Sequence, residues 1–342
     1  RPIEGAMAPP RVSLAHLPTP IEALPRLSKD IDGANLLVKR DDCTGLAMGG
    51  NKARQLEFYF GDARAQGADT VLITGAVQSN YVRMTAAAAA KLGLACHVQL
   101  EERVDNAGAT YRESGNVLLN QLFGAHIHRF PIGEDDVAAD VELDRLANEL
   151  SAAGSNPYVI HLSLGHPPLG ALGYMDAAQE ILEQQHANQL QIDEIVVASG
   201  SGQTHAGLLY GLRAQGSDLP VIGVCVRRQE SLQLPRILDH VRGLDALTNQ
   251  TNVVRSEDII LVDDFLWPSY GVSNQHSEAA MLKAARLEGL IVDPVYTAKS
   301  LAGAIHRAAD LGAGKSVLYV HTGGTPALFG YQPAITALVT DS

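Results

Sequence analysis

A lysine follows two adjacent glycines in the segment Gly49-Gly50-Asn51-Lys52, at the start of a helix predicted over 51–66. The N-terminus of a helix carries partial positive charge, which disfavours an ammonium group and lowers the pKa of a lysine placed there. A lysine kept neutral in this way is a nucleophile that forms Schiff bases with carbonyl compounds. Taken alone, Lys52 could also be an ordinary surface lysine.

A glycine-rich loop, Gly200-Ser201-Gly202-Gln203-Thr204, follows a predicted strand and opens a predicted helix. Backbone N–H groups in such a loop bind an anion, and the helix dipole adds to the attraction. The spacing is neither the dinucleotide fingerprint nor the Walker loop, so it suits a single phosphate monoester. An anion-binding loop together with a reactive lysine predicts pyridoxal 5'-phosphate (PLP) as cofactor.

Three further polar segments lie between predicted strands and helices. Gln78-Ser79-Asn80 stands where Ser and Asn are favoured as helix N-caps, but the same groups could face the carboxylate of a substrate. Tyr296 precedes a predicted helix and could act as an acid or base beside a cofactor. Thr322, before Gly323-Gly324, could hydrogen-bond a ring nitrogen as a neutral partner. Tyr296 and Thr322 could equally be packed turn residues.

Short apolar runs alternate with helical stretches along the chain, which predicts an α/β fold with parallel sheets. Glycines follow several of the predicted strands, where they could simply end strands, or could form loops that converge on one crevice at the strands' carboxyl ends. The predicted strands are 36–39, 70–74, 95–100, 126–130, 158–162, 194–198, 221–226 and 317–321, and the predicted helices are 51–66, 79–92, 115–123, 137–153, 170–186, 203–213, 275–288 and 297–311.

Length and charge limit the class of protein. At roughly 150 residues per domain, 342 residues predict about two domains. The 26 Lys+Arg against 38 Asp+Glu give 26 − 38 = −12, which argues against nucleic acid or an anionic membrane as partner. No apolar run reaches the roughly 18 residues of a membrane span. The first ten residues form an irregular arm without the apolar region of a signal peptide.

Cysteine and histidine usage gives no sign of a metal or disulfide framework. Cys43, Cys96 and Cys225 are widely spaced, with no CxxC pair. Free thiols fit the reducing cytoplasm, which is the expected location. His126 and His128 alternate on one predicted strand, but two histidines without a third ligand are weak support for a metal, so we expect none.

In sequence order, the motifs resemble those of the fold-type II PLP enzymes, the tryptophan synthase β superfamily. Within it, the chain is similar to the D-cysteine desulfhydrase and 1-aminocyclopropane-1-carboxylate (ACC) deaminase family, closest to the desulfhydrases. Further markers are Lys39-Arg40-Asp41-Asp42 and Gly170-Ala171-Leu172-Gly173-Tyr174. The resemblance covers residues 14–330. It implies two open parallel-sheet domains, a small domain over 56–164 and a large PLP-binding domain from 1–55 plus 165–342, and a homodimer.

The resemblance also implies roles for individual residues in a site for a small amino acid. Lys52 would form the Schiff base, and Asn51 would bind the 3'-oxygen of the cofactor. The phosphate would be bound by Gly200, Ser201, Gly202, Gln203 and Thr204, and Thr322 would contact the pyridine nitrogen. The substrate would be bound by Gln78, Ser79, Asn80, Tyr81 and His166. The implied catalytic residues are Lys52, Ser79, Tyr270 and Tyr296.

The implied reaction is β-elimination. PLP stabilises a carbanion at the substrate α-carbon, and a threonine at the ring nitrogen drains less charge into the ring than a carboxylate partner would, which favours elimination over transamination. D-cysteine would give pyruvate, ammonia and sulfide. L-cysteate, releasing sulfite, is the main alternative substrate, and an amino-acid racemase or a non-catalytic PLP-binding protein are further possibilities. ACC deamination is disfavoured, because ACC deaminases have Glu and Leu where this chain has Thr297 and Thr322.

Several residues depart from the usual desulfhydrase pattern. Gln203 replaces a glycine, Tyr81 a histidine and Met84 a glutamine, and residues 163–168 replace a glycine- and serine-rich loop. We expect these changes to lie near the substrate and not in the core, altering the pocket while the PLP machinery is retained. For a sulfonate substrate, donor groups could come from Arg83, His166 and His205.

Overall fold

The computed structural model describes residues 9–340, so most of the predicted N-terminal arm lies outside the described residues. The strands are β1 (Ile21–Ala23), β2 (Asn35–Lys39), β3 (Thr70–Ala76), β4 (Ala95–Glu101), β5 (His126–Phe130), β6 (Pro157–Ile160), β7 (Glu194–Ser199), β8 (Val221–Cys225), β9 (Ile260–Val262) and β10 (Ser316–Val320). The α-helices are α1 (Pro25–Ile31), α2 (Lys52–Ala65), α3 (Asn80–Leu92), α4 (Ala109–Glu113), α5 (Asn116–Leu122), α6 (Asp136–Ala152), α7 (Leu169–Ala187), α8 (Gln203–Ala214), α9 (Glu230–Thr248), α10 (Gln275–Glu288), α11 (Thr297–Leu311), α12 (Ala327–Gly330) and α13 (Gln332–Thr340).

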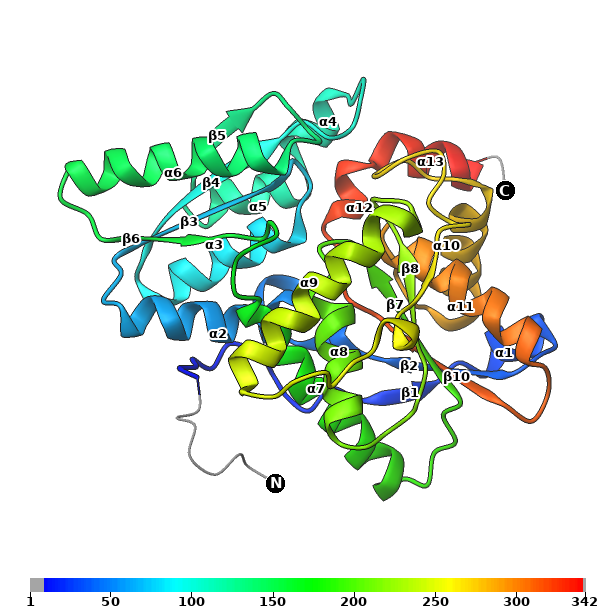
Figure 1. Ribbon diagram of the computed structural model, residues 1–342. Coiled ribbons are helices and arrows are strands. Elements are labelled where there is room, and N and C mark those ends of the chain that lie inside the picture. Colours follow the sequence, from blue (N-terminus) through cyan, green and yellow to red (C-terminus); the bar gives the residue numbers. More distant parts are fainter. Residues whose placement is uncertain (1–8, 341–342) are drawn as a thin grey trace.

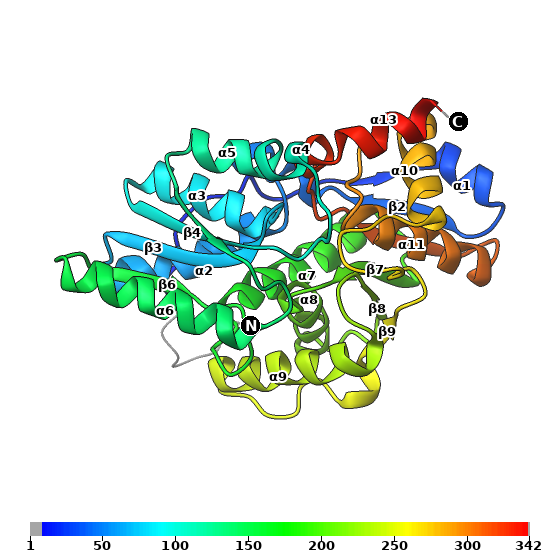
Figure 2. The same cartoon turned by 90° about the horizontal axis from the view of Figure 1, so that it is seen from above.

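The strands form two sheets that lie side by side (Figures 1 and 2). One sheet has four strands in the order β5-β4-β3-β6, and the other has six in the order β1-β2-β10-β7-β8-β9. Every neighbouring pair is parallel except β1 with β2. The predicted α/β class with two parallel-sheet domains is therefore confirmed.

The four-stranded sheet is covered on both faces (Figure 1). Successive side chains of a strand point to opposite faces of the sheet, and β3 has apolar side chains on both faces. Val71 and Ile73 pack in the cluster that includes α3 residues, whereas Leu72 packs against Leu143 of α6. All seven residues of β3 are buried, as expected for a parallel strand between two helical layers.

The six-stranded sheet is built in the same way. Ile195 and Val197 of β7 pack with residues of α7, α8 and α9, while Val196 between them packs with residues of α10 and α11. Among residues 9–340, every helix is too short or too polar to cross a bilayer.

All eight predicted strands and all eight predicted helices are present, with ends within two residues of those expected. The sequence prediction missed β1, β9 and the helices α1, α4, α9, α12 and α13. Helix α9 contains Pro235, which normally marks a helix end. Its buried Ile237, Val241 and Leu244 nevertheless have helical spacing, so apolar periodicity was the stronger signal. The predicted domain boundary between 55 and 56 falls inside α2, and the division stays a prediction.

A buried ionic network joins the end of β2 to α2 and α7. Arg54 is fully buried and donates from Nε and Nη2 to Asp41 over 2.9 and 3.0 Å. It also donates to Glu180 of α7. Tyr174 donates to Asp41 over 2.5 Å. The arginine holds the pKa of the Asp41 carboxyl below its usual range against the opposing effect of burial. The network therefore accounts for two of the family markers, Asp41 and Tyr174.

We predict that Asp41→Ala lowers the free energy of unfolding by about 3–5 kcal/mol, because it leaves the Arg54 charge buried without its main partner. Urea unfolding at neutral pH measures this loss. The control is Asp30→Ala, which removes an exposed ion pair with Lys283 and should cost at most about 1 kcal/mol. Equal losses in the two variants would contradict the role given to the buried network.

Candidate active site

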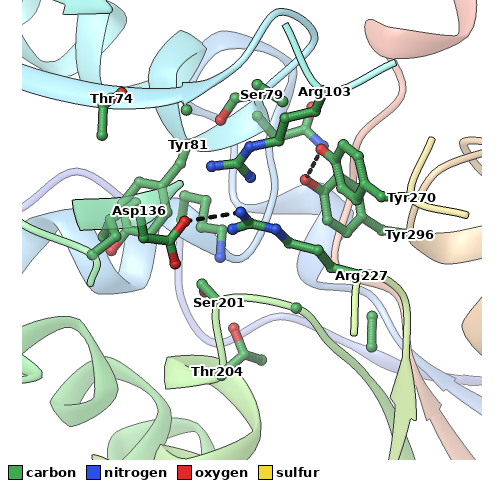
Figure 3. A pocket seen from close by; sticks show the side chains of 18 of the residues that line it. Thr74, Ser79, Tyr81, Arg103, Asp136, Ser201, Thr204, Arg227, Tyr270 and Tyr296 are labelled. Carbon is green, nitrogen blue, oxygen red and sulfur yellow. Dashed lines mark hydrogen bonds and ion pairs between the residues drawn. The ribbon is translucent and has the colours of Figure 1, made fainter. Parts of the chain in front are cut away.

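A pocket opens where the carboxyl ends of strands from both sheets meet (Figure 3). Its walls come from the segments that follow β3, β4, β7, β8 and β10, which is the crevice expected of parallel α/β sheets. Of the residues with sequence-predicted roles, those that line it are Asn51, Lys52, Ser79, Asn80, Tyr81, Gly200, Ser201, Gly202, Thr204, Tyr270, Tyr296 and Thr322.

Lys52 is the first residue of α2, and its Nζ lies 4.5 Å from the centroid of the Tyr81 ring. Desolvation lowers the pKa of Lys52 to about 7. No carboxylate within residues 9–340 forms an ion pair with it. The expected lowering of the pKa is thus found, and burial of the amine is its cause. A substantial fraction of this amine is neutral, and therefore nucleophilic, at neutral pH.

The glycine-rich loop has the backbone that an anion cradle needs. Gly202 has a φ of +97°, and a Cβ there would lie 2.9 Å from the His240 ring, so only glycine fits. Helix α8 begins at the next residue and directs its N-terminus at the loop. Thr204 Oγ1 accepts hydrogen bonds from Asn51 Nδ2 at 2.8 Å and Gln55 Nε2 at 2.6 Å. The lysine segment and the loop are therefore held together.

Two glycine segments meet beside the lysine. A Cβ on Gly323 would lie 2.6 Å from the Gly50 Cα, and Gly323 has a φ of +92°. The Asn51 backbone N–H donates to the Thr322 carbonyl over 3.0 Å. This contact places Thr322 in the same pocket as Lys52 although 270 positions separate them (322 − 52).

Ser79 and Asn80 line the small-domain side of the pocket. Ser79 is the N-cap of α3, as its sequence position predicts, and its Oγ accepts from the Val82 N–H over 3.2 Å. Asn80 Oδ1 accepts from Arg83 Nη1 and Asn116 Nδ2, which fixes the orientation of the amide.

The two tyrosines form a pair on one wall. Their hydroxyl oxygens are 2.6 Å apart. Asp293 Oδ1 accepts from the N–H groups of Val295 and Tyr296, and this turn sets the position of the Tyr296 ring. Burial raises the pKa of Tyr296 well above its ordinary value and also raises that of Tyr270, so both hydroxyls keep their protons at neutral pH.

The side chains of Gln78, Gln203 and His166 do not reach this pocket, contrary to expectation. Gln78 donates to the carbonyls of Tyr111 and Ser114. The Gln203 amide hydrogen-bonds the Tyr59 hydroxyl, so it lies away from the loop. His166 stacks on His161 beside Asp140 and lines a neighbouring pocket. Asp140, His161 and His166 are the only group of three or more potential metal ligands in residues 9–340 with ligand atoms within 4.8 Å of one another.

The expectation that the departures from the family pattern gather near the substrate was partly wrong. Tyr81 and Ser163 line the pocket. Met84, however, is fully buried in the small-domain core, because its position in the α3 sequence turns it inward. Arg83 and His205 are also fully buried. Arg83 donates to the Gly49 carbonyl over 2.9 Å, and His205 hydrogen-bonds Ser199, so neither faces the pocket.

Sequence reasoning missed the pocket's charged side chains. Arg103, Arg227 and Arg236 line it together with Glu101 and Asp136. Arg103 lies two residues after β4, and Arg227 two residues after β8. The rule that sites gather at the carboxyl ends of strands could have found both arginines.

The sequence matches the family described as "Pyridoxal-phosphate dependent enzyme" over residues 12–323. The chain belongs to this PLP-dependent enzyme family. It is 45% identical to "D-cysteine desulfhydrase" from two strains of Klebsiella pneumoniae, over 95% of this chain and 97% of each relative. These findings identify a PLP-dependent lyase.

Solved structures support the fold. A crystal structure of an "ACC deaminase homologue" is 35% identical, with a TM-score of 0.86 over 96% of both chains. An O-ureido-L-serine synthase, 18% identical, has a TM-score of 0.68 over 95% of this chain and 97% of that one, which shows a shared fold alone. PLP fits the pocket described here, because a glycine-bounded anion cradle and a lysine of lowered pKa line the same pocket.

We predict that Lys52→Ala abolishes the yellow colour of covalently bound cofactor, because it removes the amine that reacts with the aldehyde. Spectra of the dialysed variant measure this. A persistent, covalently attached chromophore would remove Lys52 from its role, and Lys299→Ala is the control, since this buried lysine donates to the carbonyls of Leu266 and Ser269.

The lowered pKa of Lys52 gives a second prediction. The neutral amine is the reactive form, so the rate of PLP uptake by the protein stripped of cofactor should rise with pH through about 7 and then level off. An unperturbed lysine would show a rise that continues to about pH 10.4. Stopped-flow absorbance across this pH range separates the two.

Proposed function

We propose that the chain catalyses β-elimination from a small α-amino acid, with D-cysteine as reference substrate and pyruvate, ammonia and sulfide as products. The observation that carries the proposal is the convergence of Lys52, Ser79, Tyr296 and Thr322 on one pocket. The near full-length similarity to D-cysteine desulfhydrases supports the same reaction.

The pocket divides into places for cofactor and substrate. Lys52 would hold PLP covalently, with Asn51 at its 3'-oxygen and Thr322 at its pyridine nitrogen. PLP, when bound, supplies an electron sink for negative charge at the substrate α-carbon. The phosphate would lie in the loop formed by Gly200, Ser201, Gly202 and Thr204, where Gln203 contributes its backbone N–H and not its amide.

The protein's own groups carry the proton transfers. Ser79 and Asn80 would bind the substrate carboxylate with hydroxyl and N–H groups at the start of α3. Lys52 would act as the base for the α-proton of the substrate, and its pKa of about 7 suits that task. Ser79 and the protonated Tyr270–Tyr296 pair are the available donors for the leaving group. Loss of that group leaves aminoacrylate, which hydrolyses to pyruvate and ammonia.

The cysteines and the family resemblance bear on location and assembly. Cys43, Cys96 and Cys225 are free thiols, and Cys43 is exposed, which supports a reducing cytoplasm. The resemblance to the family supports a homodimer, which light scattering at micromolar concentration would test.

L-cysteate is the second candidate substrate, favoured by the arginines that line the pocket. A single panel distinguishes the candidates: D-cysteine, L-cysteine, L-cysteate, β-chloro-D-alanine, D-serine and ACC, with 2-oxo acid, sulfide and sulfite all measured. We expect pyruvate in an amount equal to the released leaving group. Bound PLP with no 2-oxo acid from any member would contradict the proposed elimination, and altered product chirality without elimination would indicate a racemase.

The substitution Thr322→Glu tests whether Thr322 contacts the pyridine nitrogen of the cofactor. A carboxylate there would favour protonation of the nitrogen, so we predict a higher ratio of transamination to elimination. Quantifying the pyridoxamine form of the cofactor against pyruvate measures this ratio. Thr325→Glu, a change in the same loop but outside the pocket lining, is the control. An unchanged ratio in Thr322→Glu would show that Thr322 does not act on the ring nitrogen.

A further inference from the structure

Four side chains of the kinds that bind metal ions gather beside the active-site pocket. Asp140 and Asp144 lie four positions apart on α6, which places them on the same face of the helix. His161 directly follows β6, and His166 lies five residues further along the segment that leads to α7. Helix α6 packs against Val159 of β6 (Figure 1), so the two acids of the helix meet the two histidines of the segment.

Three of these side chains have ligand atoms close to the spacing that one ion needs. Asp140, His161 and His166 can each offer one ligand atom, with all three atoms within 4.8 Å of one another. Asp140 Oδ2 is 3.6 Å from His161 Nδ1 and 4.0 Å from His166 Nε2. Two ligands of a tetrahedral zinc ion, each about 2.1 Å from it, are about 3.4 Å apart. Shifts of less than about 1 Å would therefore bring the three side chains onto one ion.

His161 is oriented as a metal-binding histidine is. Its Nδ1 atom is buried, and no group within residues 9–340 forms a hydrogen bond with it. Its Nε2 atom lies 3.2 Å from Asp144 Oδ1. A ligating histidine typically donates its second ring N–H to a carboxylate, which fixes the ring and directs the other nitrogen at the metal. With the proton on Nε2, the Asp144 carboxylate has that role, and Nδ1 presents an unpartnered lone pair toward Asp140.

Asp140 is supported by a neighbour too, and the site is open on one side. Asp140 Oδ2 accepts a hydrogen bond from Ser163 Oγ, and the aspartate side chain is 14% exposed. The His166 ring stacks on that of His161, with centroids 4.1 Å apart. The His166 side chain is 41% exposed, so water can reach the ligand atoms from this side.

The charges around the cluster favour a cation. Three acids and two arginines line the pocket beside it, which gives 2 − 3 = −1 with histidine counted as neutral: Asp136, Asp140, Asp144, Arg228 and Arg236. Both arginines donate to Asp136. Within residues 9–340, the ion-pair partners of Asp140 and Asp144 are histidines alone. The negative charge of these two carboxylates is therefore left for a bound cation.

We propose that Asp140, His161 and His166 bind one divalent transition-metal ion of the zinc type, with Asp144 as the hydrogen-bond partner of His161. Two imidazoles and a carboxylate suit zinc and its neighbours in the transition series, whereas magnesium and calcium prefer oxygen ligands. Three protein ligands leave one coordination position for a water molecule. The proposal does not depend on the proposed β-elimination.

The ion would fasten the segment that connects the two sheets. This segment runs from β6 of the four-stranded sheet to α7, which packs on the six-stranded sheet. The Gly165 N–H of the segment donates to Asp239 of α9 over 3.3 Å. Asp140 and Ser163 also line the active-site pocket. Metal binding would therefore stabilise the connection between the domains and fix part of the active-site wall.

The sequence expectation of no metal considered only His126 and His128, which lie on β5 and do not belong to this cluster. Asp140 stands 21 positions before His161 (161 − 140). The packing of α6 on β6 brings them together, and sequence spacing gives no sign of it.

Zinc titration of the holoenzyme tests the site. The protein, free of any histidine tag, is dialysed against a chelator, and its visible spectrum confirms that PLP is retained. Calorimetry should show one zinc ion bound per chain at micromolar zinc, and magnesium should not bind at the same concentration. His161→Ala, His166→Ala and Asp144→Asn should each weaken zinc binding by at least about tenfold. The matched control is His126→Ala, an exposed histidine of β5, which should leave zinc affinity within about threefold.

Unfolding gives a second readout. Zinc should raise the urea midpoint of the wild type and of His126→Ala, because it binds the folded chain, and should not raise that of His166→Ala. The midpoint of metal-free His166→Ala should equal that of the metal-free wild type, since this side chain is half-exposed. Zinc affinity unchanged in both His161→Ala and His166→Ala would locate the ion elsewhere, at the cofactor or at the β5 histidines, and would overturn the proposal. Failure of the wild type to bind zinc, or equal binding of magnesium, would also overturn it.

Discussion

The site depends on one close contact between backbone segments from opposite ends of the chain. Gly50 and Gly323 form an isolated bridge, and no side chain could be accommodated between them. The contact holds the start of α2 against the end of β10, which puts Lys52 and Thr322 on the same pocket. Glycine is required on steric grounds here, so segments 49–52 and 322–324 are linked by geometry and not only by shared family membership.

Around that contact, buried polar groups hold the elements in place. The Arg54–Asp41 pair ties α2 to β2, and Thr204 ties the lysine segment to the phosphate loop. Arg83 reaches from α3 to the Gly49 carbonyl, which links the small-domain wall to the lysine. Breaking such pairs leaves buried charges or donors unsatisfied, so these contacts resist separation of the segments that line the pocket.

The substrate end of the pocket has a different character. Its charged side chains come from loops after strand ends, and they are contributed by both domains.

The sequence alone determined the fold class, sixteen elements and the cofactor, because these depend on local signals, and it predicts Lys52 as the reactive lysine. Periodicity predicts buried strands and helices, glycines mark positions that no Cβ can occupy, and the motifs occur in a set order. Only the tertiary structure decided which side chains face the pocket. Gln203, Met84 and Arg83 lie within three positions of pocket residues, yet helix geometry turns their side chains into the core. Arg103 and Arg227 carry no motif, and they meet because the ends of β4 and β8 belong to sheets whose packing no local pattern encodes.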